Sequence, residues 1–102
     1  MKRFGQKLPK DWVPRARVFL ALGDETRQRI LLMFERGEEL AMKDIIDACP
    51  LSRTATTHHI RTLLDARIIV AEKRARSVYL RPNPAAVIDA LQGVLTYIEE
   101  EL

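Results

Sequence analysis

The sequence predicts a mainly α-helical fold with one small β-hairpin, in the order α-α-α-α-β-β-α. Apolar residues recur at helical spacing along most of the 102-residue chain. Two runs rich in β-forming residues, IIV and SVYL, flank a charged centre between residues 68 and 80. The length suits a single domain. We therefore expect one domain over residues 11–102, preceded by a flexible basic arm at residues 1–10.

The composition predicts a soluble globular protein. Hydrophobic residues make up 47% of the chain and charged residues 30%, which argues against a disordered chain. No apolar run is long enough to span a bilayer, and no apolar stretch follows the basic N-terminus as it would in a secretory signal. The single cysteine, Cys49, excludes an internal disulfide and fits a reducing compartment. We expect a cytoplasmic protein with no membrane partner.

The first two helices are expected at residues 11–23 and 25–36. Gly23 can end the first helix. Asp24 suits the N-cap position of the second, and Gly37 stands where a glycine often ends a helix. Four residues share one face of the first helix: Trp12, Ala16, Phe19 and Leu20.

A short helix from about Met42 and a longer helix at residues 52–65 are separated by a tight turn. Pro50 disfavours helical geometry at Cys49, and Ser52 can cap the next helix at once. Helix, turn and helix in this order outline a DNA-binding helix-turn-helix.

After the helix-turn-helix the apolar period changes. Residues 68–81 form a predicted hairpin, the wing of a winged helix-turn-helix, and its turn type is left open because it has no Asn-Gly or Asp-Gly pair. The last helix is expected at about residues 84–101. It carries one apolar stripe: Val87, Leu91, Val94, Leu95, Ile98 and Leu102.

The helix at residues 52–65 has one polar and one apolar side. On a helical wheel Thr56, His59, Ile60 and Leu63 face the apolar side, toward the preceding helix. The hydroxyls, imidazole and guanidinium of the other side can hydrogen-bond to base edges or phosphates. We expect DNA contacts from this side and from the start of the helix: Ser52, Arg53, Thr54, Thr57, His58 and Arg61.

The adjacent histidines do not form a metal site on this helix. His58 and His59 lie about 100° apart around the axis, whereas helical ligand pairs use i, i+3 or i, i+4. His59 is expected to be a half-buried structural residue with a ring nitrogen bonded to a backbone carbonyl or a neighbouring side chain. His58 is expected to contact DNA, with an idle surface residue as the alternative. The chain also has no Gly-rich phosphate loop, GxSxG or HExxH motif, so we expect neither an enzyme nor a cofactor.

Charge is concentrated in two segments. Residues 52–81 carry seven Lys and Arg against two acidic residues, a net +5, whereas residues 82–102 carry four acidic residues and no Lys or Arg, a net −4. The hairpin tip reads KRAR. Its cations can reach a phosphate backbone or a minor groove, or can simply keep the tip soluble. The predicted wing contacts are Lys73, Arg74 and Arg76.

Three segments together resemble the ArsR-type family of winged-helix transcriptional repressors: LGDETRQRILLMF (22–34), LSRTATTHHIRTLLDARII (51–69) and VAEKRARSVYL (70–80). The resemblance implies a homodimer that binds an imperfect inverted repeat in double-stranded DNA and is released by an effector. The helix at 52–65 would enter the major groove. The first and last helices would form the dimer interface through Trp12, Phe19, Leu20, Leu91, Val94, Leu95 and Ile98.

The effector is not identified by the resemblance. Many members of that family sense metals through cysteines in the first helix of the helix-turn-helix, but here this segment reads ELAMKDIID; others use histidines and carboxylates on the last helix, which here has no histidine. Cys49 is either a small buried residue at the turn or a single-thiol sensor. Two alternatives stay open: a winged-helix module that binds a protein in place of DNA, and a metal-dependent sensor with an atypical site.

Overall fold

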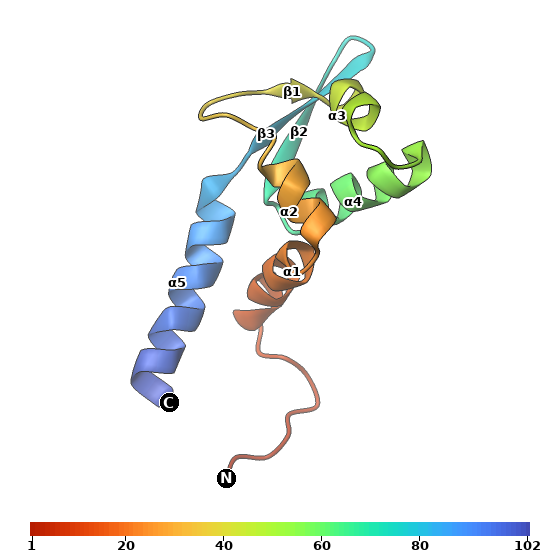
Figure 1. The fold of residues 1–102 in the computed structure, drawn as a ribbon. Helices are drawn as coiled ribbons and strands as arrows, with labels where there is room; N and C mark the ends of the chain where they lie inside the picture. Colours follow the sequence, from red (N-terminus) through yellow and green to blue (C-terminus); the bar gives the residue numbers. More distant parts are fainter.

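The computed structural model describes residues 1–102 and shows five helices with a three-stranded antiparallel sheet (Figure 1). The helices and the hairpin follow the predicted order, and the sheet contains one strand, β1, that the sequence did not predict. The elements are α1 (Trp12–Leu22), α2 (Glu25–Leu31), β1 (Leu40–Ala41), α3 (Met42–Ala48), α4 (Arg53–Asp65), β2 (Ile69–Arg74), β3 (Ser77–Pro82) and α5 (Pro84–Glu101).

The predicted end of the second helix is wrong. The sequence predicts a helix to residue 36, but α2 ends at Leu31. The hydrogen bonds that follow join residues three apart, from Met33 N to Ile30 O and from Phe34 N to Leu31 O. Leu31, Met33 and Phe34 are partly buried against the core, and this packing turns the chain away from the helix axis. Gly37, expected to end the helix, lies instead in the loop that follows, with φ of 73°.

The strand β1 was not expected from the sequence. Leu40 pairs with Leu80 and Ala41 with Tyr79, which places β1 beside β3 on the side opposite β2. A strand of two residues shows no alternating pattern that a sequence could reveal. It ties the loop after α2 to the wing.

Both predicted helix caps are confirmed. The Asp24 carboxylate accepts a hydrogen bond from the Arg27 backbone N–H at 3.0 Å, and Ser52 Oγ accepts one from the Ala55 N–H at 3.1 Å. Cys49 has an extended ψ of 135° before Pro50, so the turn falls where the proline predicts it.

The helix α4 is followed by a residue in the left-handed conformation, where the chain turns into the hairpin. Arg67 has φ of 61°, Ile68 N donates to Leu63 O at 3.1 Å, and Arg67 N donates to Leu64 O at 2.9 Å. These two bonds are those of a Schellman motif, which usually has glycine at the left-handed position. Asn83, just before α5, donates through its side chain to Arg67 O at 2.9 Å.

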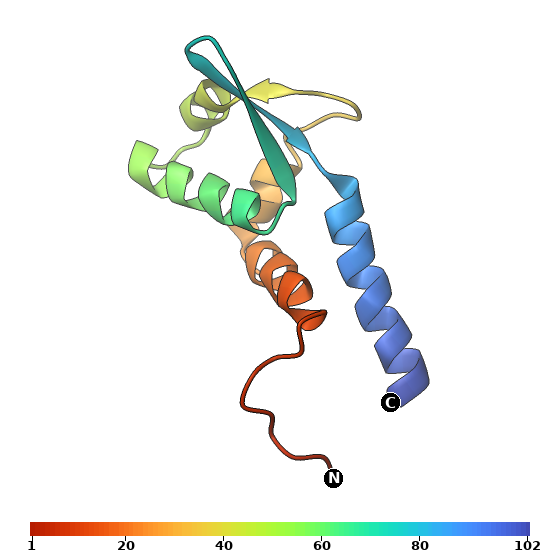
Figure 2. The same ribbon diagram turned by 180° about the vertical axis from the view of Figure 1, so that it is seen from behind.

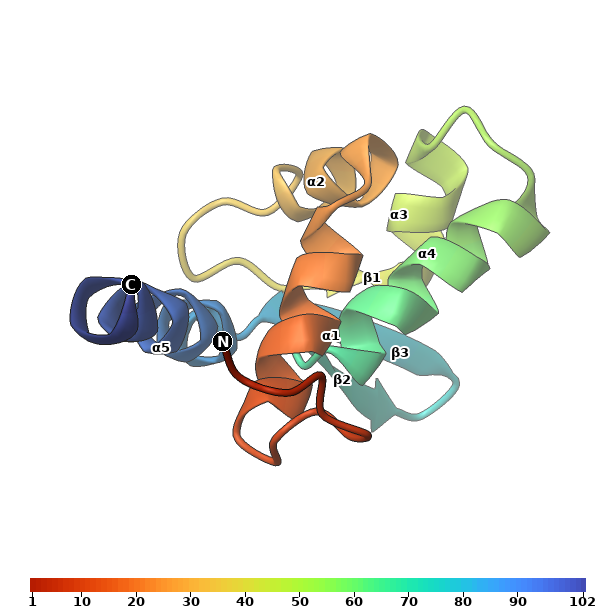
Figure 3. The ribbon, with the colours of Figure 1, turned by 90° about the horizontal axis from the view of Figure 1, so that it is seen from below.

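The hydrophobic core lies where α4 meets the surrounding helices and the base of the hairpin. Figure 3 shows α1 and α4 side by side, with α5 alongside α1 at the edge of the molecule. The largest fully buried side chains come from α1, α2, α3, α4, both hairpin strands and Ile68 just before β2, whereas α5 buries only Ala90. The core residues are Val18, Ala21, Ile30, Ile45, Ile46, Ile60, Leu63, Ala66, Ile68, Ile69, Leu80 and Ala90.

The hairpin and the chain ends lie at opposite ends of the molecule. Figures 1 and 2 show the tip of the hairpin projecting beyond α3 at one end, and α5 running down past α1 to the other. The longest dimension is 52 Å. Ala75, at the hairpin turn, takes a left-handed φ of 53° that such turns usually assign to Gly, Asn or Asp.

Candidate nucleic-acid interface

The polar side of α4 is open to solvent. Ser52, Arg53, Thr54, His58 and Arg61 are all exposed, and Thr57 is half-buried. The side chains of Arg53, Thr54, His58 and Arg61 form no hydrogen bond or ion pair within the chain. Their donors and acceptors are therefore available to a ligand that presents base edges and phosphates.

The other side of α4 is fixed to the body of the protein. Thr56, Ile60 and Leu63 are buried. His59 has only 18% of its side chain exposed, and its Nδ1 lies 3.0 Å from Arg27 Nη1. The expectation of a half-buried structural histidine is confirmed. Because a guanidinium only donates, Nδ1 accepts and the ring proton sits on Nε2.

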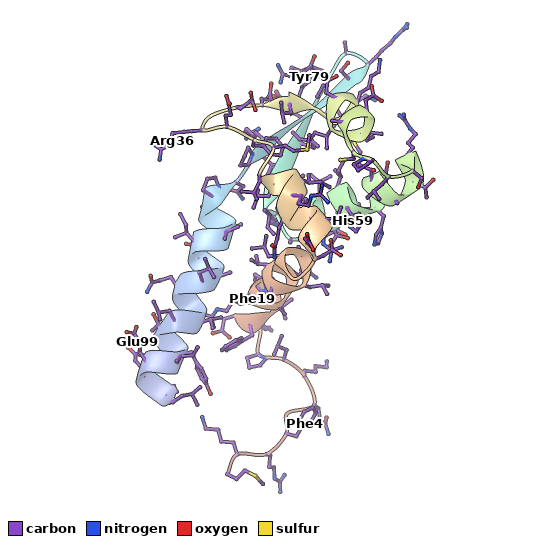
Figure 4. All side chains as sticks on the ribbon, viewed as in Figure 1. Phe4, Phe19, Arg36, His59, Tyr79 and Glu99 are labelled. Carbon is purple, nitrogen blue, oxygen red and sulfur yellow. The ribbon has the colours of Figure 1, made fainter.

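Arg27 was not singled out by sequence reasoning, yet it connects three helices. Its Nε donates to Ala21 O at 2.8 Å and its Nη2 to Leu20 O at 3.0 Å, at the end of α1, while Nη1 lies 3.0 Å from Nδ1 of His59 on α4. Figure 4 labels His59 where α4 faces the other helices. The Arg27 backbone N–H lowers the pKa of Asp24 below its ordinary value. No local pattern announces this role, because Arg27 and His59 are 32 residues apart.

The three predicted wing contacts differ in their surroundings. Lys73 and Arg76 are exposed and take part in no ion pair. Arg74 instead bonds to the Glu39 carboxylate, its Nε lies 3.5 Å from Glu72 Oε2, and its guanidinium lies 4.1 Å from the centre of the Tyr79 ring. The bond to Glu39 raises the pKa of Arg74. Arg74 is thus partly neutralised within the wing, which the sequence did not predict.

A groove of about 590 Å³ separates the helix-turn-helix from the hairpin. Lys43 of α3, Arg53 of α4 and Arg76 of the hairpin line it, together with Thr57, Ser77 and one acidic residue, Asp44. Sequence reasoning missed Lys43 and Ser77 because α3 and the wing become neighbours only in the folded chain. The three cations from three elements outnumber this one carboxylate, and the net positive charge of the groove suits a polyanion such as a nucleic-acid backbone.

The predicted apolar stripe of α5 divides into two faces. Val87, Ala90, Val94 and Tyr97 face the protein, with Tyr97 in an edge-to-face contact with Trp12 at 5.3 Å. Trp12 is half-buried, with its ring against Tyr97 of its own chain, and its place in a dimer interface stays a prediction.

The second face of α5 is exposed. It continues the spacing of three and four residues along the whole helix: Ile88, Leu91, Leu95, Ile98 and Leu102. Phe19 and Leu20 of α1 are exposed as well, by 42% and 69%. The structure thus leaves most of the residues predicted for a dimer interface uncovered, with Val94 half-buried.

Metal ligands do not gather anywhere in the chain. No three His, Cys, Asp or Glu side chains lie close enough together to hold an ion. Cys49 is a free, half-buried thiol that lines a small cavity of about 230 Å³ between α2 and the α3–α4 turn, with Arg29 and Met33. None of the helices combines the length and apolar character needed to cross a membrane.

The sequence is similar to a known domain and to known regulators. Residues 15–71 match a family described as a helix-turn-helix domain. The chain is 26% identical to the transcriptional repressor SdpR of Bacillus subtilis, over 81% of this chain and 91% of that protein. It is 33% identical to the arsenic resistance transcriptional regulator ArsR1 of Pseudomonas putida, over 83% of this chain and 69% of that protein.

Solved structures show the same fold. An ArsR-like transcriptional regulator from Rhodococcus sp. RHA1 matches with a TM-score of 0.75 and 26% identity, over 87% of this chain and 83% of that one. The homodimeric winged helix-turn-helix DNA-binding domain of Mb0332 from Mycobacterium bovis matches with a TM-score of 0.66 and 25% identity, over 98% and 94%. The predicted winged helix-turn-helix fold is confirmed.

Proposed function

The chain belongs to the ArsR family of winged-helix DNA-binding transcriptional regulators, and we propose that it is a homodimeric repressor that binds an inverted repeat. One observation carries the proposal: the polar side of α4 is exposed and free of partners, whereas the opposite side is locked to α1 and α2. A rigid helix with one free polar side fits the major groove of B-DNA. We place the protein in the cytoplasm with its DNA.

In the proposed complex α4 reads base edges through Thr54, Thr57, His58 and Arg61, while Ser52 and Arg53 at its start approach phosphates. Lys73 and Arg76 of the wing contact the flanking DNA phosphates, and Lys43, in the groove between α3 and the hairpin, adds a further phosphate contact. Arg74 serves chiefly to hold the wing, because two carboxylates already share its charge.

The proposed dimer forms through the exposed faces of α1 and α5. Phe19, Leu20 and the uncovered face of α5 make up an apolar surface that a monomer would leave in water. A two-fold axis at this surface would set two α4 helices on half-sites about 34 Å apart along the DNA. Repressor activity is inferred from SdpR, which is named a repressor.

The effector of the proposed repressor differs from those of metal-sensing members. The α3 segment has no cysteine and α5 has no histidine, so the two kinds of metal site that the family resemblance implies lack their characteristic ligands. We propose that any effector is an organic ligand or a protein.

The test is selection of bound fragments from genomic DNA, followed by affinity measurements on the selected duplexes at two salt concentrations. We expect an inverted repeat and a slope of log K against log salt of about −5 to −9, because three to five phosphate contacts per subunit release counterions. Random fragments and weak binding at low salt would contradict the proposal and leave a protein-binding winged helix.

A pair of substitutions separates base reading from charge. Arg61→Ala should weaken binding to the selected duplex by ~1–3 kcal/mol and to random duplexes by less, if Arg61 contacts a base. Arg36→Ala is the matched control, since Arg36 is exposed on the loop before β1, away from α4 (Figure 4). Equal losses on both duplexes would make Arg61 a phosphate contact.

A further inference from the structure

The first ten residues form a basic arm whose side chains make no hydrogen bond or ion pair with the rest of the chain. All ten are exposed, and only Pro9 and Lys10 bond to the body, through their carbonyls to Trp12 and Val13 of α1. The arm carries four cations and no acidic residue. It also exposes Phe4 and Leu8, by 101% and 50%.

The end of α5 has the complementary chemistry. Glu99, Glu100 and Glu101 are exposed and take part in no ion pair, and no Lys or Arg follows residue 81. The carbonyl end of the helix adds a partial negative charge there. Ile98 and Leu102 are exposed beside these glutamates.

The arm and the end of α5 lie at the same end of the molecule. Figure 4 labels Phe4 and Glu99 at the end opposite Tyr79 of the wing, and Figure 3 shows both chain ends together. With the wing and the start of α4 at the other side of a molecule 52 Å long, the arm leaves the body away from the elements that would meet DNA.

We propose that in the dimer the basic arm of each subunit docks on the acidic end of the partner subunit's α5. The inference rests on the proposed homodimer, because the exposed face of α5 that would meet a second copy continues into this acidic end. Lys2, Arg3 and Lys7 then pair with the partner's glutamates, and the apolar side chains of the arm cover the last turn of the stripe. Charge complementarity selects this occupant: a basic segment and an acidic helix end are both unpaired within one subunit.

Two charge-reversed chains test the contact. One carries Lys2→Glu, Arg3→Glu and Lys7→Glu; the other carries Glu99→Lys, Glu100→Lys and Glu101→Lys. All six positions are exposed, so both chains should fold. Each homodimer should dissociate at least about tenfold more readily than the wild type at low salt, because attraction becomes repulsion on both sides of the axis.

Mixing the two chains distinguishes contact between subunits from contact within one. In the mixed dimer every arm meets an opposite charge on its partner, whereas each chain alone keeps like charges. Native mass spectrometry should therefore show more mixed dimer than the statistical half, with the excess lost at about 0.5 M salt. The control mixture replaces the arm-reversed chain by Arg29→Glu, Arg36→Glu and Lys43→Glu, which has the same net charge, and should show no excess.

Each other outcome overturns the proposal in a recognisable way. Rescue only when both reversals share one chain means that the arm docks on its own helix. A statistical mixture, or equal excess in the control, means that no specific contact exists. An arm-reversed chain that dimerises normally but binds DNA more weakly places the arm on DNA. A wild-type chain that stays monomeric removes the proposed dimer itself, which is a different failure.

Discussion

At the scale of single residues, the buried hydroxyl of Thr56 stands out because it has no partner. The side chain is fully buried on the inner side of α4, and Oγ1 forms no hydrogen bond. An unpaired buried hydroxyl costs stability, and valine keeps the branched shape without it. We expect Thr56→Val to raise the free energy of unfolding by about 1 kcal/mol in urea titrations.

Thr62→Val is the control for that substitution. Thr62 lies on the same helix, but its hydroxyl donates to His58 O at 3.1 Å, so its removal should give no gain. A loss of stability in Thr56→Val would show that the hydroxyl finds a partner in solution.

Arg67 is a second residue that costs stability, because a residue with a side chain adopts a strained left-handed backbone conformation there. It holds the left-handed position that ends α4, where a residue with a Cβ costs about 1–2 kcal/mol relative to the right-handed region. Glycine relieves this strain and loses part of the gain to its greater freedom in the unfolded chain. We expect Arg67→Gly to stabilise the protein by about 0.5–1 kcal/mol, measured by thermal unfolding. Arg67→Ala keeps the Cβ and should not stabilise the protein. A gain in stability in Arg67→Ala would show that the effect comes from loss of the guanidinium.

Sequence reasoning succeeded at this scale where the cause is local. The caps of Asp24 and Ser52 follow from side chains that reach backbone groups three residues on. The burial of His59 follows from its place on a helical wheel. Its partner, Arg27, could not be predicted, because the two meet only through the packing of α2 on α4.

At the scale of elements, the wing shows why residue type and function can diverge. KRAR predicts three equivalent cations, but the loop before β1 brings Glu39 to Arg74 and leaves Lys73 and Arg76 free. The loop reaches the wing only because Leu40 and Ala41 pair with β3. No apolar periodicity in the sequence marks that strand or the early end of α2.

The wing cations should therefore respond differently to substitution. We expect Arg76→Ala to reduce the salt slope of DNA binding by about one and to leave hydrogen exchange in β2 and β3 unchanged. Arg74→Ala should speed exchange of these amides, because the wing loses its tie to Glu39. Glu39→Ala is the control, since it removes the acceptor of the same hydrogen bond without removing a cation. An Arg74→Ala chain with normal exchange and a slope reduced by one would make Arg74 a phosphate contact.

At the scale of the whole molecule, charge and apolar surface are separated along the long axis. The basic groove lies between the helix-turn-helix and the wing, whereas the acidic glutamates and exposed leucines lie along α5. The sequence predicted this polarity through its segment charges. The sequence could not show which half of the α5 stripe stays exposed, because that depends on how α5 packs on α1, where Tyr97 contacts Trp12.

The exposed face of α5 yields the last prediction. Leu91 and Leu95 are half exposed, at 49% and 50%, and lie outside the core. Leu91→Glu with Leu95→Glu should leave the monomer folded and raise the dimer dissociation constant by at least about a hundredfold, because each buried leucine is worth up to ~1.5–3 kcal/mol. Sedimentation of this variant should show a monomer. The slope of log K for DNA binding against log salt should fall to about half of the wild-type value, because one subunit contacts half as many phosphates.

The matched control places the same charges one step around the helix. Gln92→Glu with Thr96→Glu adds two carboxylates to exposed positions of α5 outside the apolar stripe, and should leave sedimentation unchanged. A control chain that also dissociates would attribute the effect to net charge. A Leu91 and Leu95 variant that still sediments as a dimer and binds the inverted repeat as tightly as the wild type would place the interface on another surface, and the basic arm would then need a different partner.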